Sequence, residues 1–178
     1  RANVYAVNAE TGAEVWKARL DTHPIARVTG APKLVAGRLY VPLSSLEESG
    51  AGNPSDPCCT FRGGLAAYDA RTGKQLWRFN TIPAPGEPGG DTWPAGHYER
   101  GGGPTWITGS YDPELNLLYW GVGNPAPDWN GDHRPGDNLY SSSLIALDAR
   151  TGALKWHFQF TPHDTHDWDA NQIPVLVD

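Results

Sequence analysis

Five side chains that can bind a metal ion or move a proton lie close together near the end of the chain. Residues 161–169 read TPHDTHDWD and contain His163, Asp164, His166, Asp167 and Asp169. Hard cations such as Ca²⁺ take several carboxylate or carbonyl oxygens at once, and this stretch offers such a density of oxygen donors. The other interpretation is a solvated acidic turn whose aspartates cap nearby backbone amides. The stretch alone leaves both interpretations open.

A zinc site is not expected in this stretch. His163 and His166 have the proximity of zinc ligands, but no cysteine or third histidine stands at ligand spacing from them. Two arginines elsewhere in the loops, Arg62 and Arg134, are expected to anchor those loops through salt bridges and to take no part in catalysis.

The two cysteines, Cys58 and Cys59, are neighbours in the chain. A bond between neighbours closes only a small ring and cannot join distant segments. If the pair is oxidised, it stiffens the chain locally and indicates an oxidising compartment such as the periplasm. If it is reduced, it is a small apolar pair, and the sequence leaves both states open.

Composition and charge limit the classes of function. The chain has 178 residues, a net charge of −6 and a pI of about 5.4, without a basic run, so nucleic acid is not expected as the main partner. No apolar run approaches the roughly 18 residues of a membrane span. Because strand patterns lie close to both ends, IPVLVD at 173–178 among them, we expect an internal fragment of a longer protein.

An all-β fold is predicted by the 21 Gly, 16 Pro and 8 Trp and by the scarcity of helical spacing. Three copies of one pattern support this prediction: VYAVNAETGAEVW at 4–16, LAAYDARTGKQLW at 65–77 and LIALDARTGALKW at 144–156. Each copy alternates apolar residues and then continues through Asp or Asn, two residues, Thr-Gly, three residues and Trp. Such internal repetition is the signature of repeat architectures.

The repeat predicts a β-hairpin. An inner strand runs into a residue whose side chain caps the turn, namely Asn8, Asp69 or Asp148. A glycine then takes a positive φ before the return strand that carries the tryptophan; these glycines are Gly12, Gly73 and Gly152, and the tryptophans are Trp16, Trp77 and Trp156. Because the tryptophans recur with the repeat, we interpret them as structural.

The hairpins must stack, because each buries only one face, and a closed ring of blades removes exposed strand edges. The repeats are further apart than a four-stranded blade of roughly 40–50 residues, so long loops are inserted between them. Residues 27–44 are predicted to form two strands joined at Ala36-Gly37, and residues 107–124 a hairpin turned between Asp112 and Asn116. The chain is therefore expected to hold about two blades and part of a third.

The repeat resembles the tryptophan-docking repeat of eight-bladed quinoprotein β-propellers. The rest of the chain resembles the methanol/ethanol dehydrogenase branch of that family, which uses pyrroloquinoline quinone (PQQ). The resemblance covers nearly the whole chain, so that residues 1–178 are interpreted as one partial PQQ-type propeller domain. Its most specific pieces are VTGAP (28–32), GGGPTW (101–106), YWGVGNPAPDWN (119–130), RPGDN (134–138) and TPHDTHDWD (161–169).

The resemblance implies roles for several residues. Asn124 corresponds to the family's metal-binding asparagine, and Asp167 to its catalytic aspartate at the metal. Trp106, which lies outside the repeat, corresponds to the tryptophan that stacks under the flat quinone. The other interpretation of Asn124 is a cap of the turn into Pro125.

Further contacts with the cofactor and the metal are implied in the same way. Thr29 corresponds to a PQQ-contacting threonine, and Ser44 or Ser45 to a PQQ-contacting serine. The family's metal-binding glutamate falls on Glu47 or Glu48: gapless counting from Pro32 favours the first, and matching of the second serine favours the second.

Two features depart from the methanol-oxidising branch. Cys58-Cys59 follows the glutamates, whereas in that branch the vicinal cysteines precede the metal-binding glutamate and cover PQQ; the context here resembles the polyvinyl alcohol dehydrogenase relatives. Asp169 stands where calcium-dependent members often have a small residue and lanthanide-dependent members have an aspartate. An added carboxylate suits a trivalent ion, so the resemblance implies Ca²⁺ or a lanthanide.

The resemblance thus implies a PQQ-dependent alcohol dehydrogenase that oxidises a primary alcohol to an aldehyde, with Asp167 as the general base. Cytochrome c or a quinone is the implied electron acceptor, and the periplasm, or its membrane face, the implied location. The alternative is a non-catalytic propeller scaffold or assembly protein that shares the docking repeat. Such a protein keeps the docking tryptophans but has no reason to keep Asn124, Trp106 and Asp167 together.

Overall fold

The computed structural model describes residues 2–47, 59–96 and 101–177. These residues contain ten strands and one short 3₁₀ helix, η1, so the all-β prediction is confirmed. The elements are β1 (Asn3–Val7), β2 (Glu14–Arg19), β3 (Lys33–Val35), β4 (Arg38–Leu43), β5 (Gly64–Asp69), β6 (Gln75–Asn80), η1 (Gly90–Thr92), β7 (Ser110–Asp112), β8 (Leu117–Val122), β9 (Ser143–Asp148) and β10 (Leu154–Gln159).

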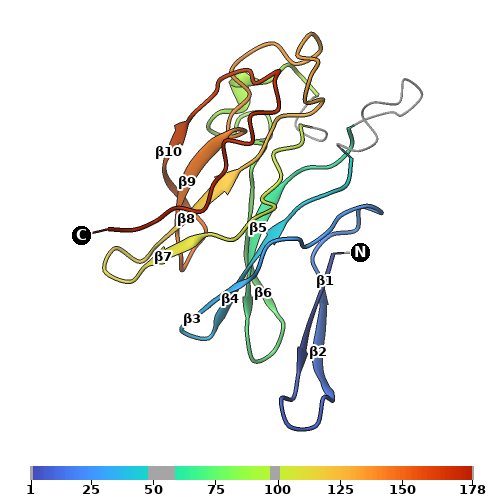
Figure 1. Ribbon diagram of the computed structural model, residues 1–178, viewed down its shortest axis with the longest axis vertical. Coiled ribbons are helices and arrows are strands. Elements are labelled where there is room, and N and C mark those ends of the chain that lie inside the picture. The colour runs from blue at the N-terminus through green and yellow to red at the C-terminus, as the bar shows by residue number, and fades with distance from the viewer. Residues whose placement is uncertain (1, 48–58, 97–100, 178) are drawn as a thin grey trace.

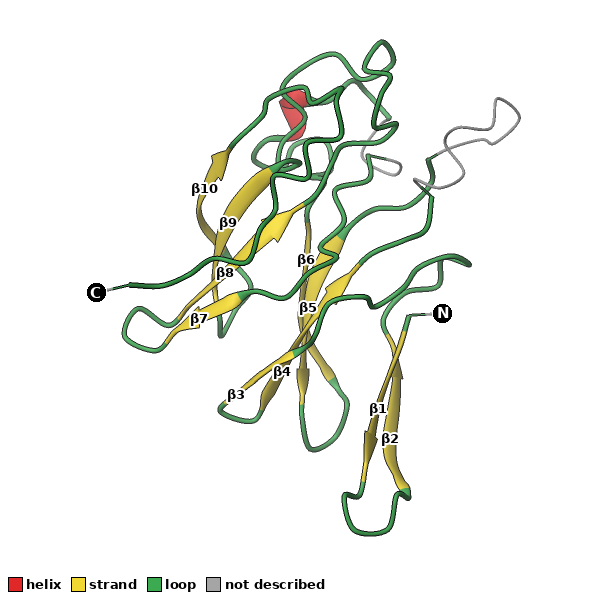
Figure 2. Cartoon of the chain, viewed as in Figure 1, coloured by secondary structure: helices red, strands yellow, loops and turns green. Residues whose placement is uncertain are grey.

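The strands form three antiparallel sheets that follow one another along the chain (Figure 1). β1 and β2 make a two-stranded hairpin, β3 to β6 a four-stranded sheet in sequence order, and β7 to β10 a second four-stranded sheet in sequence order. The long loops gather at the end of the molecule opposite the hairpin turns, together with η1 (Figure 2). This loop end is where the predicted site residues lie.

All three repeats form hairpins with the same turn. In the second, between β5 and β6, Asp69 Oδ1 accepts hydrogen bonds from the backbone N of Arg71 at 3.1 Å and of Thr72 at 2.8 Å. The Thr72 hydroxyl also donates to this carboxylate at 2.8 Å, and these bonds lower the pKa of Asp69. Gly73 follows with a φ of 71°, as the sequence pattern predicts.

The tryptophans of the first two repeats each pack on the turn of the next repeat. Trp16 Nε1 donates to the carbonyl of Ala70 at 3.0 Å, and its ring lies over Gly73, where a methyl group would come within 2.7 Å of the indole. Trp77 repeats this contact one sheet further on, donating to Ala149 O at 3.2 Å. The Thr-Gly pair of the repeat therefore has two functions: it closes one turn and leaves space for the preceding tryptophan.

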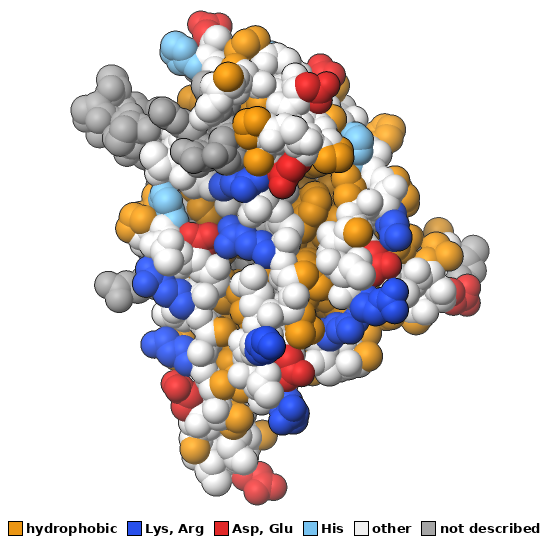
Figure 3. All heavy atoms as spheres, turned by 180° about the vertical axis from the view of Figure 1, so that it is seen from behind, with side chains coloured by type: hydrophobic (Ala, Val, Ile, Leu, Met, Phe, Trp, Pro, Cys, Tyr) orange, Lys and Arg blue, Asp and Glu red, His pale blue; other side chains and the backbone are white. Residues whose placement is uncertain are grey.

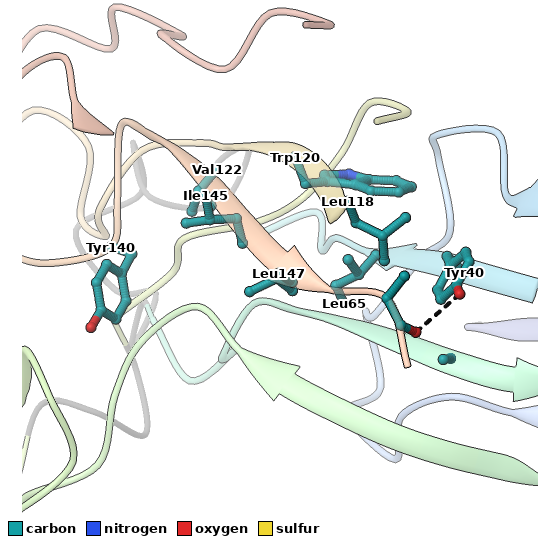
Figure 4. Packing of buried hydrophobic residues seen from close by; sticks show 10 residues of the cluster. Tyr40, Leu65, Leu118, Trp120, Val122, Tyr140, Ile145 and Leu147 are labelled. Carbon is teal, nitrogen blue, oxygen red and sulfur yellow. Dashed lines mark hydrogen bonds between the residues drawn. The ribbon is translucent and has the colours of Figure 1, made fainter. Parts of the chain in front are cut away.

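The main core lies between the two four-stranded sheets. Figure 4 shows buried side chains from β4, β5, β8 and β9 packed together with one from the loop before β9: Tyr40, Leu65, Leu118, Trp120, Val122, Tyr140, Ile145 and Leu147. The Tyr40 hydroxyl donates to the Ala149 carbonyl at 3.0 Å across this interface (Figure 4). Apolar burial on this scale fixes one sheet against the other, so their loop ends keep a constant separation.

The two hairpins predicted between the repeats are confirmed. β3 and β4 are joined at Ala36 and Gly37, both with positive φ, and β7 and β8 are joined by residues 113–116. The strand expected at the end of the chain is wrong for the described residues, because 173–177 form none. Val177 is 87% exposed there, and no neighbouring strand among the described residues pairs with this segment.

The surface mixes both signs of charge. On the face shown in Figure 3, Lys and Arg side chains alternate with Asp and Glu, and apolar patches lie between them. Among the described residues, no helix is long and apolar enough to span a membrane.

Candidate active site

A cavity of about 450 Å³ opens at the loop end of the sheets. Its wall is built by segments that precede β3, follow β4, precede β7, follow β8 and follow β10, and so combines residues far apart in the chain. It is lined by Thr29, Ser44, Ser45, Leu46, Pro104, Trp106, Asn124, Asp128, Trp129, Asp167 and Asp169. Seven of the residues singled out from the sequence therefore share one cavity.

Trp106 is held in this wall through its neighbour Thr105. The buried Thr105 hydroxyl accepts a hydrogen bond from Leu43 N at 2.8 Å and lies 2.6 Å from Gly64 O, to which it can donate. Thr105 N donates to Leu43 O at 3.1 Å, so this segment is tied to the end of β4. Because Trp106 directly follows, its position depends on the sheet and not on a free loop.

The indole of Trp106 is fixed on its polar edge. Gly123 packs against it, since a methyl group there would come within 3.1 Å of Trp106 Nε1. The fully buried Asn171, with its amide turned so that both of its ends are satisfied, accepts a hydrogen bond from Trp106 Nε1 at 2.6 Å. Thr29 Oγ1 donates to Trp106 O at 2.8 Å on the other side. A flat apolar ring is thereby presented to the cavity in one orientation.

Asn124, Asp167 and Asp169 also meet in the lining of this cavity. Asn124 comes two residues after β8 and is 6% exposed. Its Nδ2 donates to Asp167 Oδ1, and Asp169 Oδ1 lies 3.5 Å away. Asp167 and Asp169 have φ values of 57° and 51°, in the left-handed region, which is uncommon for residues other than glycine but which aspartate tolerates better than most.

The electrostatics of this group fit a cation. Burial, and then the nearby Asp167 charge, raise the pKa of Asp169. Asn124 Oδ1 is buried and has no hydrogen-bond partner in the described part of the chain, which is costly for an amide oxygen unless something else satisfies it. Oxygen donors from carboxylates and an amide are those that Ca²⁺ and related hard cations prefer.

The described residues do not complete a metal site by themselves. Within 2–47, 59–96 and 101–177, no group of three or more His, Cys, Asp or Glu side chains is placed to hold a metal ion. Of the three aspartates that line the cavity, Asp167 and Asp169 lie beside the amide of Asn124, and Asp128 lies in the loop after β8.

Glu47, one of the two predicted glutamate ligands, is directed elsewhere. Its Oε1 accepts hydrogen bonds from the backbone N and the hydroxyl of Thr60, both at 2.7 Å, and its Oε2 accepts one from Phe61 N at 2.8 Å. It does not line the cavity. Glu48 and Cys58 lie outside the described residues, so the ligand role of Glu48 and the Cys58–Cys59 disulfide stay predictions.

Ser44 and Ser45 continue directly from β4 into the cavity wall, and both are buried. Ser44 exchanges two backbone hydrogen bonds with Arg27, at 2.7 and 2.9 Å, which prolongs the sheet by one bridge. The backbone of Ser44 is therefore fixed by this bridge, and Ser45 follows it directly.

The acidic stretch 161–169 combines the two interpretations that its sequence allows. Asp164 is a buried capping residue: its carboxylate accepts hydrogen bonds from His166 N at 2.9 Å, Trp168 N at 3.3 Å and Ser142 Oγ at 3.2 Å. Asp167 and Asp169 instead reach the cavity. The His166 ring stacks on Trp168 with centroids 5.5 Å apart, and His163 Nδ1 lies 3.0 Å from the carbonyl oxygen of Gly136.

Three further residues of the site escape the sequence patterns. Asp128 is buried and Trp129 is largely exposed, and both line the cavity from the loop after β8. Asn171 supports the indole from beyond the acidic stretch. The adjacent Asp and Trp of PAPDWN were available as a signal, but nothing in their spacing says that they face the same space as Asp167.

The sheets, the docking tryptophans and this cavity define a class of protein. The chain belongs to the family of the glucose/ethanol/alcohol dehydrogenase β-propeller domain (PQQ), whose model matches residues 25–178. It therefore forms part of a β-propeller, as the repeats predict.

Particular relatives resemble the chain along almost its whole length. It is 37% identical to the quinoprotein alcohol dehydrogenase PedH of Pseudomonas putida, over 99% of this chain and 30% of that protein. It is also 37% identical to methanol dehydrogenase [cytochrome c] subunit 1 of Methylorubrum extorquens, over 98% of this chain and 29% of that protein. A europium-containing methanol dehydrogenase superposes with a TM-score of 0.79 at 32% identity, over 95% of this chain and 31% of that one. The chain thus spans less than a third of the length of each of these relatives.

Proposed function

We propose that the protein of which this chain is a part oxidises a primary alcohol to an aldehyde, with PQQ as the cofactor and Ca²⁺ or a lanthanide as the metal. The observation that carries the proposal is the convergence of Asn124, Asp167 and Asp169 on one cavity that is also lined by Trp106. The names of the relatives, quinoprotein alcohol dehydrogenase and methanol dehydrogenase, support the same reaction.

The chemistry that side chains lack comes from the bound groups: when present, PQQ accepts a hydride and the cation polarises its carbonyl as a Lewis acid. The chain supplies position, orientation and proton transfer. Trp106, with Asn171 fixing its edge, offers an apolar plane for a flat ring. Thr29, Ser44 and Ser45 provide hydroxyls along the same wall as cofactor contacts.

Asp167 is the proposed general base. Its carboxylate lies in the cavity and is fixed by the hydrogen bond from Asn124 Nδ2. In the reaction it takes the alcohol's hydroxyl proton on a carboxylate oxygen. A positioned base of this kind typically contributes about 10²–10⁴-fold to the rate.

Asn124 Oδ1, Asp167 and Asp169 are the proposed metal ligands among the described residues. Nδ2 of Asn124 faces the two carboxylates, and its Oδ1 is buried without a hydrogen-bond partner among the described residues. A half-turn of this amide would bring Oδ1 to Asp167 and Asp169, so that one ion would take all three donors. Burial and the charge of Asp167 raise the pKa of Asp169, as expected for carboxylates that share a cation site. Because Glu47 spends both of its oxygens on Thr60 and Phe61, we propose Glu48 as the glutamate ligand.

The remaining parts of the proposal concern the whole protein. Cytochrome c or a quinone is the proposed electron acceptor, and the periplasm, or its membrane face, the proposed location; one relative is named as a cytochrome c-linked enzyme. A vicinal Cys58–Cys59 disulfide would be consistent with that compartment.

The test uses the full-length protein loaded with PQQ and either Ca²⁺ or a light lanthanide. We expect primary alcohols to reduce an artificial electron acceptor, and Asp167→Asn to lower kcat by about 10²–10⁴-fold while PQQ stays bound. Asp132→Asn, the same substitution at an exposed aspartate of a nearby loop, is the control and should retain the wild-type kcat. Failure of the wild-type protein to bind PQQ would instead favour the non-catalytic scaffold.

A further inference from the structure

The Arg134 side chain is a buried cation beside the cavity and is not itself part of the cavity lining. Arg134 is 0% exposed, and its guanidinium donates to backbone carbonyls and one amide. Nε and Nη2 donate to Pro127 O at 3.1 and 3.0 Å, Nη2 also donates to Asp128 O at 3.2 Å and to Asp164 O, and Nη1 donates to Asn138 Oδ1 at 2.8 Å. The sequence predicts salt bridges for this arginine, but its hydrogen bonds to carbonyl oxygens are what join the loops.

The carbonyls that Arg134 holds belong to two different walls of the cavity. Pro127 and Asp128 lie in the loop that leaves Asn124 and carries Trp129. Asp164 begins the turn that carries Asp167, and it comes after β10. A single planar side chain therefore couples the amide side of the proposed metal site to its carboxylate side.

The turn behind Asp167 continues this connection. While Arg134 holds the Asp164 carbonyl, the Asp164 carboxylate accepts hydrogen bonds from His166 N and Trp168 N. These two residues flank Asp167, whose φ of 57° would otherwise be unfavourable. Asp164 thus constrains the backbone on both sides of the proposed base.

Only an arginine can make this set of contacts. Burial lowers the pKa of Arg134, and the charges of Asp128 and Asp164 oppose that shift. An arginine remains charged even so, and its rigid fork reaches several acceptors at once, whereas lysine presents one compact ammonium group. A lysine here would keep the charge and lose most of these hydrogen bonds.

We propose that Arg134, acting through Asp164, is a positioning residue that sets the distance between Asn124 and Asp167. The inference rests on the proposed function, because it assigns Arg134 to the geometry of that base and metal site. It makes Arg134 neither a catalytic residue nor a ligand. The proposal predicts that replacing Arg134 lowers kcat and changes the coordination of the bound metal ion, while PQQ stays bound.

The test compares Arg134→Lys with Arg78→Lys in the full-length holoprotein. Arg78 is a matched control, because it also joins segments, donating to Leu20 O at 3.2 Å and pairing with Asp21 at 2.9 Å, but it lies outside the cavity lining. We measure kcat per bound PQQ, and separately the emission lifetime of bound Eu³⁺, which shortens when water replaces a protein ligand.

For Arg134→Lys we expect kcat per bound PQQ to fall about 100-fold, the loss that a displacement of roughly 1 Å can cause, and the Eu³⁺ lifetime to shorten. Arg78→Lys should change neither quantity. Wild-type kcat and lifetime in folded Arg134→Lys would overturn the proposal. If Arg134→Lys gives no folded holoprotein, Asp164→Asn decides the question in the same assays, with the same two outcomes.

A different result would count against the proposed function instead. An inactive wild-type holoprotein refutes alcohol oxidation, and the Eu³⁺ lifetime then still tests whether Arg134 positions the ligands.

Discussion

At the scale of single residues, side-chain oxygens that already accept hydrogen bonds differ from those that are free to bind an ion. Asp164 and Glu47 are acidic, but their carboxylates are saturated by backbone and hydroxyl donors. Asn124 Oδ1 has no hydrogen-bond partner in the described part of the chain. The distinction between structural and ligand oxygens therefore follows from hydrogen-bond satisfaction, which residue type alone does not give.

Asp169 sets the expected metal preference. Its pKa is raised by burial and by the neighbouring Asp167, so its charge is costly unless a cation lies nearby. Coulomb attraction to this carboxylate is greater for a trivalent ion than for a divalent one. We expect Asp169→Ala to reduce lanthanide-supported activity at least about tenfold more than calcium-supported activity, a difference of about 1.4 kcal/mol. Steady-state rates of the full-length protein with each metal measure this. An equal loss with both metals would show that Asp169 does not distinguish the two charges.

The two glutamates are expected to separate by role. Glu48→Gln should weaken Eu³⁺ binding, measured by luminescence titration of the PQQ-loaded protein. Glu47→Gln should leave that affinity unchanged and lower stability by about 1.5–3 kcal/mol, because it weakens charge-assisted bonds to Thr60 and Phe61. The reverse pattern would make Glu47 the ligand.

At the scale of elements, the repeat turn connects one sheet to the next. Gly73 and Gly152 each serve as the surface on which the preceding tryptophan packs, and each also has a left-handed φ. A substitution at either glycine therefore carries two costs, backbone strain and steric overlap, and removal of the tryptophan ring separates them.

In a Trp16→Ala background, Gly73→Ala should cost about 1–2 kcal/mol, the strain of a left-handed alanine. In the wild-type background it should cost about 1–3 kcal/mol more, because its methyl group would overlap the Trp16 ring at 2.7 Å. Chemical unfolding of the full-length protein in both backgrounds measures the difference. Equal destabilisation would mean that the indole does not press on this turn in solution.

The sequence predicts the elements better than it predicts the loops that join them. The hairpins follow from local chemistry, since Asp69 caps its own turn and Gly73 supplies the positive φ. The end of the chain fails for the opposite reason: an apolar run is read as a strand, but a strand needs a neighbour, which residues 173–177 lack in the described structure.

At the scale of the whole molecule, two stacked sheets hold the cavity open between loops that are distant in the chain. The core in Figure 4 fixes the separation of β4 and β8, from which Ser44 and Asn124 continue into the cavity wall. The sequence could indicate through family resemblance that Asn124, Trp106 and Asp167 act together. It could not reveal the roles of Asp128 and Asn171 in the site, or the hydrogen bonds by which Arg134 links two loops, because these depend on tertiary contacts that no local pattern encodes.

The central claim is that the oxygens of Asn124, Asp167 and Asp169 bind one ion in the cavity lined by Trp106. A crystal structure of the full-length protein with PQQ and Eu³⁺, with an anomalous difference map at the europium edge, tests it most directly. We predict one anomalous peak about 2.3–2.6 Å from Asn124 Oδ1 and from the carboxylates of Asp167 and Asp169. A europium peak elsewhere in the molecule, with no ion bound to the Asn124 oxygen, would contradict the claim.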